Sequence, residues 1–171
     1  MGAILSIAIV FVSKTGNTRL LAERARILVP ADSLVYFGAP SPEALQASTV
    51  LMGFWTDKGT CPEPDRGFLR SCHGKRVFLF ATYGYGGDPT YADHVLGNAC
   101  GLLPEDAEYL GGYACLGKMP ATTRERFVRM AVSAPDRFLP KIANFDNALT
   151  HPDEADLHGF DVALCRAIAT P

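Results

Sequence analysis

Three hydroxyl side chains and a glycine lie between an apolar run and a helical stretch near the start of the chain. The segment consists of Ser13, Lys14, Thr15, Gly16, Asn17 and Thr18. The start of a helix offers unpaired N–H groups and the positive end of its dipole, and the hydroxyls add donors. The segment therefore predicts a phosphate-binding loop, with an ordinary helix cap at Thr15 or Asn17 as the alternative. It matches neither GxxxxGK followed by Ser or Thr nor GxGxxG, which disfavours nucleoside triphosphates and dinucleotides.

Two later segments, 53–61 and 82–91, carry the aromatic side chains that a flat ligand needs. Together they hold the only tryptophan and three of the six tyrosines, with glycines that let the backbone approach ring heteroatoms. The alternative, that each aromatic fills the core or covers the surface, is weaker for a cluster than for a single residue. We expect a cofactor to contact Trp55, Thr56, Asp57, Lys58, Gly59, Thr82, Tyr83, Gly84, Tyr85, Gly87, Asp88 and Tyr91.

Five apolar runs alternate with stretches of helical spacing, a pattern typical of βαβ units in a parallel sheet. The runs are 4–12, 33–37, 50–54, 76–81 and 109–116, and the helical stretches are 18–28, 42–47, 65–72 and 91–100. The first and fourth runs are apolar on both alternating faces, as strands covered by helices on both sides must be. We predict an α/β fold, a three-layer sandwich with a five-stranded parallel sheet. Ligands bind off the carboxyl ends of such strands, so the three loops should meet.

Three further helical stretches are predicted after the fifth run, at 122–132, 136–149 and 153–169. Pro120, Pro135 and Pro152 each stand just before one of them. These positions suit boundaries between tail helices better than a linker between domains. We expect a single domain over 1–171, with a core at 4–119 and extra C-terminal helices at 120–171.

Length, composition and charge narrow the class of protein. A chain of 171 residues, 48% of them apolar, is long enough to bury one substantial core. Lys and Arg are scattered and the formal charge is −2, so we expect no nucleic-acid partner. No apolar run approaches the roughly 20 residues that span a bilayer, and no signal-peptide pattern is present. We therefore expect no membrane contact and a cytoplasmic protein.

Cysteines and histidines show no pattern typical of a catalytic or metal site. The five cysteines are widely spaced without a CxxC pair, so core packing is expected, with Cys61 the candidate for exposure. The four histidines lie in helical stretches, their flanks or the tail, and the acidic residues show no metal-ligand spacing. We predict neither catalytic residues nor a metal ion.

The hexapeptide at 13–18 resembles the flavodoxin phosphate signature (Ser/Thr)-x-Thr-Gly-Asn-Thr, and Gly87-Asp88-x-x-Tyr91 resembles the third flavin loop of that family. The resemblance covers about residues 4–119. It implies the strand order 2-1-3-4-5 and flavin mononucleotide (FMN) as the cofactor. It also implies that Lys14, at the variable position of the signature, points outward, and that four residues hold the phosphate: Ser13, Thr15, Asn17 and Thr18.

The resemblance assigns the flavin ring less completely. Thr56 matches the threonine of the second loop, whose following residues reach flavin N5, and Tyr91 matches the outer stacking tyrosine. The inner stacking partner stays open between Trp55, Tyr83 and Tyr85. Carboxylates at Asp57 and Asp88 would lower the flavin potential if they lie near the ring.

The function implied by the resemblance is electron transfer to or from a redox partner protein, which is either a reductase or an acceptor enzyme. The alternative is an NAD(P)H-dependent FMN or quinone reductase of the same superfamily, whose pocket or oligomer the tail helices would supply. A domain that has lost flavin is a further alternative. Flavodoxins are strongly acidic, whereas this chain is nearly neutral with Lys14, Lys58 and Lys118 in its loops, so its partner need not prefer a negative surface.

Overall fold

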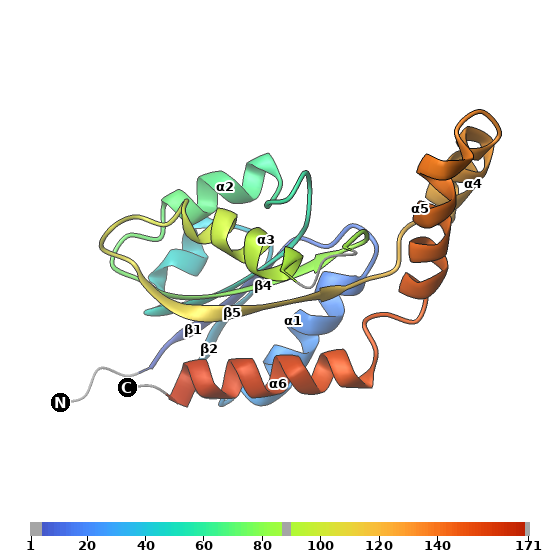
Figure 1. The fold of residues 1–171 in the computed structure, drawn as a ribbon. Helices are drawn as coiled ribbons and strands as arrows, with labels where there is room; N and C mark the ends of the chain where they lie inside the picture. The colour runs from blue at the N-terminus through green and yellow to red at the C-terminus, as the bar shows by residue number, and fades with distance from the viewer. Residues whose placement is uncertain (1–4, 87–89, 170–171) are drawn as a thin grey trace.

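In a computed structural model that describes residues 5–86 and 90–169, one parallel sheet of five strands forms the centre of the protein (Figure 1). The strand order is β2-β1-β3-β4-β5, so the expected order is confirmed. The strands are β1 (Ile7–Phe11), β2 (Leu34–Gly38), β3 (Thr49–Trp55), β4 (Arg76–Tyr83) and β5 (Glu108–Leu116). The helices are α1 (Asn17–Leu28), the 3₁₀ helix η1 (Pro42–Gln46), α2 (Glu63–Arg70), α3 (Tyr91–Cys100), α4 (Ala121–Ala131), α5 (Pro135–Ala148) and α6 (Glu154–Ala169).

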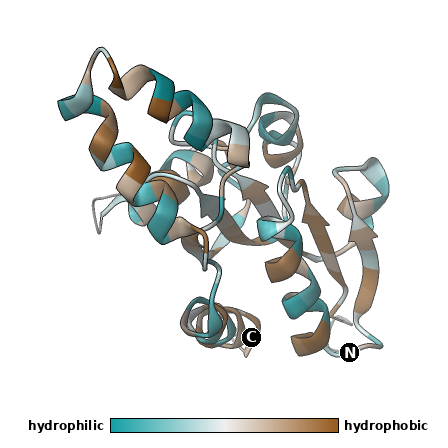
Figure 2. Ribbon diagram, turned by 90° about the vertical axis from the view of Figure 1, so that its right-hand side faces the viewer, coloured by the Kyte–Doolittle hydropathy of each residue, from teal (hydrophilic) through white to brown (hydrophobic). Residues whose placement is uncertain are grey.

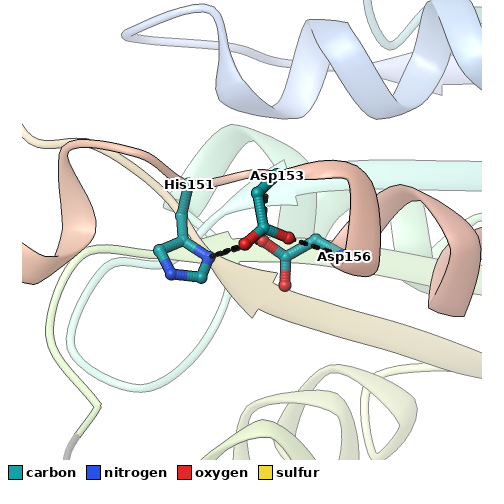
Figure 3. Close-up of side chains that lie close together, drawn as sticks. All are labelled: His151, Asp153 and Asp156. Carbon is teal, nitrogen blue, oxygen red and sulfur yellow. Dashed lines mark hydrogen bonds and ion pairs between the residues drawn. The ribbon is translucent and has the colours of Figure 1, made fainter.

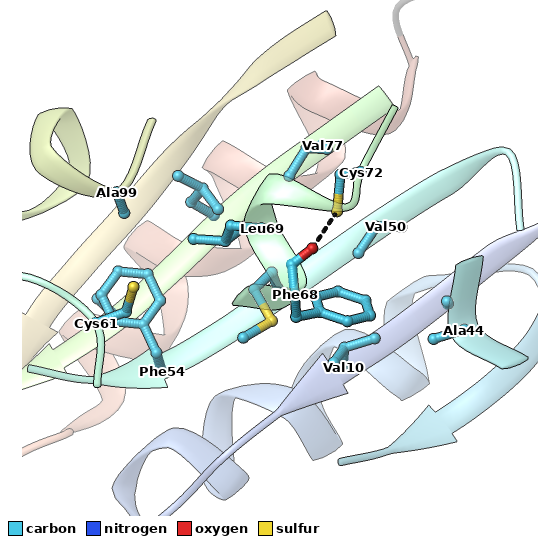
Figure 4. Packing of buried hydrophobic residues seen from close by; sticks show 14 of the residues in the cluster. Val10, Ala44, Val50, Phe54, Cys61, Phe68, Leu69, Cys72, Val77 and Ala99 are labelled. Atoms are coloured by element: carbon cyan, nitrogen blue, oxygen red, sulfur yellow. Dashed lines mark hydrogen bonds between the residues drawn. The ribbon is translucent and has the colours of Figure 1, made fainter. Parts of the chain in front are cut away.

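Helices cover both faces of the sheet, which makes the predicted three-layer sandwich. On β1, the alternating Ala8 and Val10 join a core with η1, α2 and α3 (Figure 4), whereas Ile7 and Ile9 join a core with α1 and α6. Side chains of a strand point alternately to its two faces, so a strand buried on both faces must be apolar throughout. This explains why the runs that form β1 and β4 are apolar on both alternating faces.

A glycine in β3 is required by close packing against the next strand. Gly53 pairs with Phe80 of β4, and a Cβ atom at Gly53 would overlap the ring of Phe80. That ring is fully buried and packs edge-on against Phe160 of α6, with ring centroids 5.5 Å apart. The glycine therefore makes room for a large aromatic in the core between the sheet and α6.

The three helices after β5 have different places in the molecule. The last helix, α6, covers the sheet: Phe160 and Leu164 are buried with residues of α1, and Arg24 of α1 binds Asp161 through its Nε at 2.8 Å. The other two, α4 and α5, pack on each other as a hairpin that stands away from the sheet (Figure 1). The hairpin is thus inserted between the last strand and the helix that closes the fold.

The cysteines lie mostly in the core, but the prediction that Cys61 is the exposed one is wrong. Cys61 is fully buried in the cluster that contains Phe54 (Figure 4), because the chain turns inward there before α2 begins. Cys165 on α6 is exposed instead. Separately, none of the helices within the described ranges is long and apolar enough to cross a membrane.

Candidate functional site

A cleft of about 380 Å³ opens at the carboxyl ends of β1, β3, β4 and β5, where the sequence predicted that its loops would meet. The volume lies in the range of small-molecule and cofactor sites. Ten of the predicted cofactor contacts line it: Lys14, Thr15, Asn17, Trp55, Thr56, Thr82, Tyr83, Gly84, Tyr85 and Tyr91. The fold therefore brings together side chains from three separate loops.

The predicted phosphate loop ends on a left-handed glycine at the start of α1. Gly16 has φ 91°, a conformation that glycine adopts without strain, and α1 begins at the next residue. The Oγ of Ser13 accepts hydrogen bonds from the N–H groups of Gly16 at 3.1 Å and Arg19 at 3.2 Å. The loop is therefore held in shape by its own side chain, and Asn17, the first residue of α1, lines the cleft.

Asn17 and Thr18 connect this loop to the neighbouring strands. The Nδ2 of Asn17 donates to Thr15 Oγ1 at 2.8 Å and to the carbonyl of Lys118 at 2.9 Å. The Thr18 hydroxyl is buried and lies 2.9 Å from the hydroxyl of Thr82 at the end of β4. Ser13, Gly16 and Thr18 are not among the described residues that line the cleft, and their predicted phosphate contacts stay predictions.

The aromatic side chains surround the cleft, as expected. Tyr83 and Tyr91 meet edge to face with ring centroids 5.2 Å apart, and burial raises the pKa of the Tyr83 hydroxyl. Lys14 differs from its expected outward orientation, because its ammonium lies 4.9 Å from the ring centroid of Trp55 at the cleft. A cation over the face of an aromatic ring is attracted by the ring quadrupole, and tryptophan attracts it most strongly.

The second loop places Thr56 in the cleft and its following residues outside the cleft lining. Asp57 and Thr60 exchange backbone hydrogen bonds of 2.8 and 3.1 Å, and the two residues between them, Lys58 and Gly59, have φ of 50° and 81°. This is the geometry of a tight two-residue turn. Asn98 of α3 fixes the turn by donating to the carbonyl of Gly59 at 3.0 Å.

Asp57, Lys58 and Gly59 are not among the described residues that line the cleft, so their cofactor roles stay predictions. The predicted cofactor contacts Gly87 and Asp88 lie outside the described residues, as does the expectation that Asp88 lowers the flavin potential. The third loop is described at 82–86 and from residue 90 onward.

The helical hairpin also lines the cleft, but none of its residues is among the predicted cofactor contacts. Three residues of α4 complete the wall: Thr123, Arg126 and Phe127. The third loop is attached to α5, since Nδ2 of Asn144 donates to the carbonyl of Gly84 at 2.7 Å. Lys141 of α5 lies 5.2 Å from the ring centroid of Tyr85. No sequence spacing relates these residues, because the contacts depend on how the hairpin folds back.

Positive charge dominates the wall of the cleft. Among the described residues that line it, Lys14, Lys118 and Arg126 are basic, and none is a carboxylate. A site of this kind favours an anionic ligand, because each cation gains Coulomb energy with it and no fixed anion opposes it.

A histidine and two aspartates lie together just beyond this site, at the start of α6 (Figure 3). Asp153 and Asp156 form reciprocal bonds: the N–H of Asp156 donates to Asp153 Oδ1 at 3.0 Å, and the N–H of Asp153 donates to Asp156 Oδ2 at 2.9 Å. His151 Nδ1 lies 2.6 Å from Asp156 Oδ2. The aspartates are accounted for as a capping box that satisfies the first N–H groups of α6.

The residues of the cleft fit a phosphate-bearing aromatic cofactor such as FMN. Two buried polar atoms at the site, Asn17 Oδ1 and Thr56 Oγ1, have no hydrogen-bond partner within the described part of the chain. Buried polar atoms without partners are costly, and a bound ligand is one way to satisfy them. With the helix start, the cations and the aromatic rings, the wall supplies groups for both the phosphate and the ring of a flavin.

Comparison with known families identifies the type of domain. The flavodoxin domain model matches residues 8–164. The chain belongs to the flavodoxin-domain family. The match includes the hairpin and the first part of α6, so it reaches past the 4–119 segment that carries the sequence resemblance.

Two relatives of this flavodoxin-domain chain are described as "Flavodoxin-like domain-containing protein BilS". The protein from Clostridium symbiosum (strain WAL-14163) is 34% identical over 183 residues, covering 94% of this chain and 95% of the relative. The protein from Clostridioides difficile (strain CD3) is 25% identical over 159 residues, covering 88% of this chain and 89% of the relative. Both relatives are therefore similar to the chain over nearly their whole length.

Solved flavodoxin structures share the fold. Oxidised Flavodoxin 1 from Bacillus cereus superposes with a TM-score of 0.62 at 13% identity, covering 97% of this chain and 99% of that one. Oxidised Flavodoxin 2 from Bacillus cereus gives 0.60 at 15% identity, with 97% and 99% covered. The flavodoxin-like architecture is thus shared although few residues are identical.

Proposed function

We propose that this flavodoxin-domain chain binds FMN in the cleft and passes electrons to or from a redox partner protein. The observation that carries the proposal is the convergence of the loop at the head of α1 with two aromatic loops around one cleft. The buried, unpartnered Asn17 Oδ1 and Thr56 Oγ1 at the same place support it, because a ligand would satisfy them.

The chain's own residues would bind and orient the cofactor. The first turn of α1, the hydroxyl of Thr15 and the ammonium groups of Lys14 and Lys118 would hold the phosphate. Trp55 and Tyr91, with Tyr83 and Tyr85 beside them, would contact the ring and exclude water from it. When bound, FMN supplies reversible electron-transfer chemistry, and the protein sets its orientation and electrostatic surroundings.

One observation favours the second candidate function, an NAD(P)H-dependent FMN or quinone reductase. The wall formed by Thr123, Arg126 and Phe127 adds a side to the cleft that the three loops alone would leave open. An added wall of this kind would help to hold a small substrate over a flavin. The two candidates differ in whether NADPH reduces the loaded protein directly.

The test is to titrate the full-length chain with FMN and follow the flavin absorbance and the quenching of its fluorescence. We expect a yellow one-to-one complex. The Asn17→Ala variant should bind about 10-fold to 100-fold more weakly, because it removes a buried group that shapes the phosphate loop. The exposed Asn147→Ala variant of α5 is the matched control and should bind like the parent.

A parent chain that binds no FMN would refute the proposal. Oxidation of NADPH by the loaded chain without an added reductase would instead establish the reductase candidate. Location is a further proposal: all five cysteines are unpaired, which is usual in a reducing compartment and supports the cytoplasm.

A further inference from the structure

The α4–α5 hairpin exposes large apolar side chains, including Val128, Met130 and Leu139. Figure 2, seen from this side, shows apolar segments on both helices. A groove of about 580 Å³ runs along the hairpin between α4 and the end of α5. The groove shares Met119 with the cofactor cleft, so the two hollows adjoin.

The same hairpin is basic, although the chain as a whole is acidic. Residues 121–148 contain five basic and three acidic side chains, whereas the formal charge of the whole chain is −2. Arg124 is bound to Asp146 by two hydrogen bonds of 2.7 and 3.1 Å. Among the described residues, no carboxylate lies within ion-pair distance of the other four: Arg126, Arg129, Arg137 and Lys141.

We propose that the α4–α5 hairpin is the docking surface for a redox partner protein with an acidic surface patch. The proposal rests on the proposed function, in which bound FMN carries the electrons that the partner exchanges. Arg129 lines the groove and Arg126 lines the cleft, so cations border both hollows. Opposite charge steers the partner to the hairpin, and the groove supplies contact area once it arrives. The groove adjoins the cleft at Met119, so a partner seated there lies next to the cofactor site.

The charge of the whole molecule and the charge of the hairpin predict partner proteins of opposite charge. With the phosphate of FMN the loaded chain carries a net charge of roughly −4, so attraction by net charge alone favours a basic partner. Docking at the hairpin favours an acidic partner. The sign of the salt dependence therefore separates local docking from overall charge.

The experiment uses the full chain loaded with FMN and reduced by dithionite. Stopped-flow spectroscopy follows its oxidation by two probe proteins, an acidic plastocyanin and a basic cytochrome c, as ionic strength rises. In each encounter the reduced flavin loses one electron and one copper(II) or haem iron(III) centre gains it. We expect the rate constant with plastocyanin to fall by about tenfold or more with salt, and that with cytochrome c not to fall.

Charge reversal on the hairpin provides the matched variants. Arg129→Glu combined with Arg137→Glu should remove most of the plastocyanin rate at low salt, while the flavin spectrum and the reduction of a neutral benzoquinone stay unchanged. The control is Arg70→Glu combined with Lys75→Glu, which makes the same change of charge at the exposed end of α2 and just before β4. The control should leave the salt dependence with plastocyanin in place.

Several results would overturn the docking surface. One is a plastocyanin rate that rises with salt, and another is an equal effect of the hairpin variants and the control variants. A third is a dimer at low salt, seen by sedimentation, that the hairpin variants dissociate, because it would assign the hairpin surface to a second copy of the chain.

Binding of plastocyanin to the FMN-free chain is measured separately by NMR shifts. A chain that binds plastocyanin through the hairpin but binds no FMN would refute only the proposed function. A chain that does not bind plastocyanin at low salt would refute the docking surface.

Discussion

At the scale of single residues, two kinds of polar group matter most. Some bind residues outside their own loop, as Asn17 binds the carbonyl of Lys118, and these connect distant parts of the cleft. Others are buried without a hydrogen-bond partner within the described residues. Asp65 in the first turn of α2 is the clearest case, since its side chain is fully buried and neither carboxylate oxygen has a hydrogen-bond partner within the described residues.

The carboxyl group of Asp65 should make the stability of the protein depend on pH. Burial raises its pKa from 3.8 to about 6, so the folded state holds this proton more tightly than the unfolded state does. The stabilising contribution is fully present below pH 3.8 and is lost as pH rises through about 6. Asp65→Asn should therefore raise the free energy of unfolding at pH 7.5 by about 1–3 kcal/mol and change it little at pH 4.

Urea unfolding at the two pH values measures this effect. The control is Asp32→Asn, which changes an exposed carboxylate and should show no comparable difference between pH 4 and pH 7.5. If Asp65→Asn and Asp32→Asn behave alike, a buried and unpaired Asp65 is not the source of the pH dependence.

At the scale of elements, the sheet positions the site through packing that begins at its centre. The carboxyl ends of β3 and β4 carry Trp55 and Tyr83 into the cleft, and the same two strands pack closely at Gly53 and Phe80. Any change that separates these strands also changes the distance between the two aromatic loops. Packing within the sheet and geometry of the cleft are thus coupled.

A methyl group at Gly53 tests that coupling. Gly53→Ala should destabilise the fold by about 1–3 kcal/mol, because the new Cβ overlaps a fully buried ring that cannot move without disturbing α6. Urea midpoints measure the loss, and Phe80→Leu introduced into the same chain should recover part of it. The matched control, Gly97→Ala on the exposed side of α3, meets no atom within 4 Å and should stabilise by up to about 1 kcal/mol. Equal effects at the two glycines would contradict the packing argument.

At the scale of the whole molecule, the inserted hairpin joins the proposed docking face to the cofactor site. One part of it lines the groove, and another part contacts the third loop through Asn144 and Lys141. A partner on the hairpin would therefore sit on an element that also holds the loop of Tyr85. Binding of cofactor and of partner should depend on the same pair of helices.

Removing the amide of Asn144 tests whether the hairpin supports the cofactor loop. Asn144→Ala should weaken FMN binding about threefold to tenfold, since the carbonyl of Gly84 loses its donor and the loop loses one attachment. Fluorescence titration measures the affinity, and the melting temperature should change little because the hairpin packs mainly on itself. The neighbouring exposed variant Asn147→Ala should keep the parent affinity, and an equal affinity for Asn144→Ala would show that the loop does not need the hairpin.

The elements and the loops that carry chemistry could be predicted from the sequence. Apolar alternation and helical spacing placed every strand and helix within a few residues of its observed ends. The strands β1 and β4, for example, are buried on both faces, and this burial shows in the residues of each strand alone. The glycine and hydroxyls at 13–18 likewise predicted a loop at the head of a helix from neighbouring residues alone. Local backbone preferences and burial of a continuous segment can be read from neighbouring residues.

Tertiary packing sets how distant segments of the chain meet. It placed Lys14 over Trp55, buried Cys61 beside Phe54, and divided the tail into an inserted hairpin and a closing helix. It also brought Arg126 and Asn144 to the cleft. These contacts join residues far apart in the chain, so their free energy depends on packing of the whole fold, and no local spacing in the sequence records it.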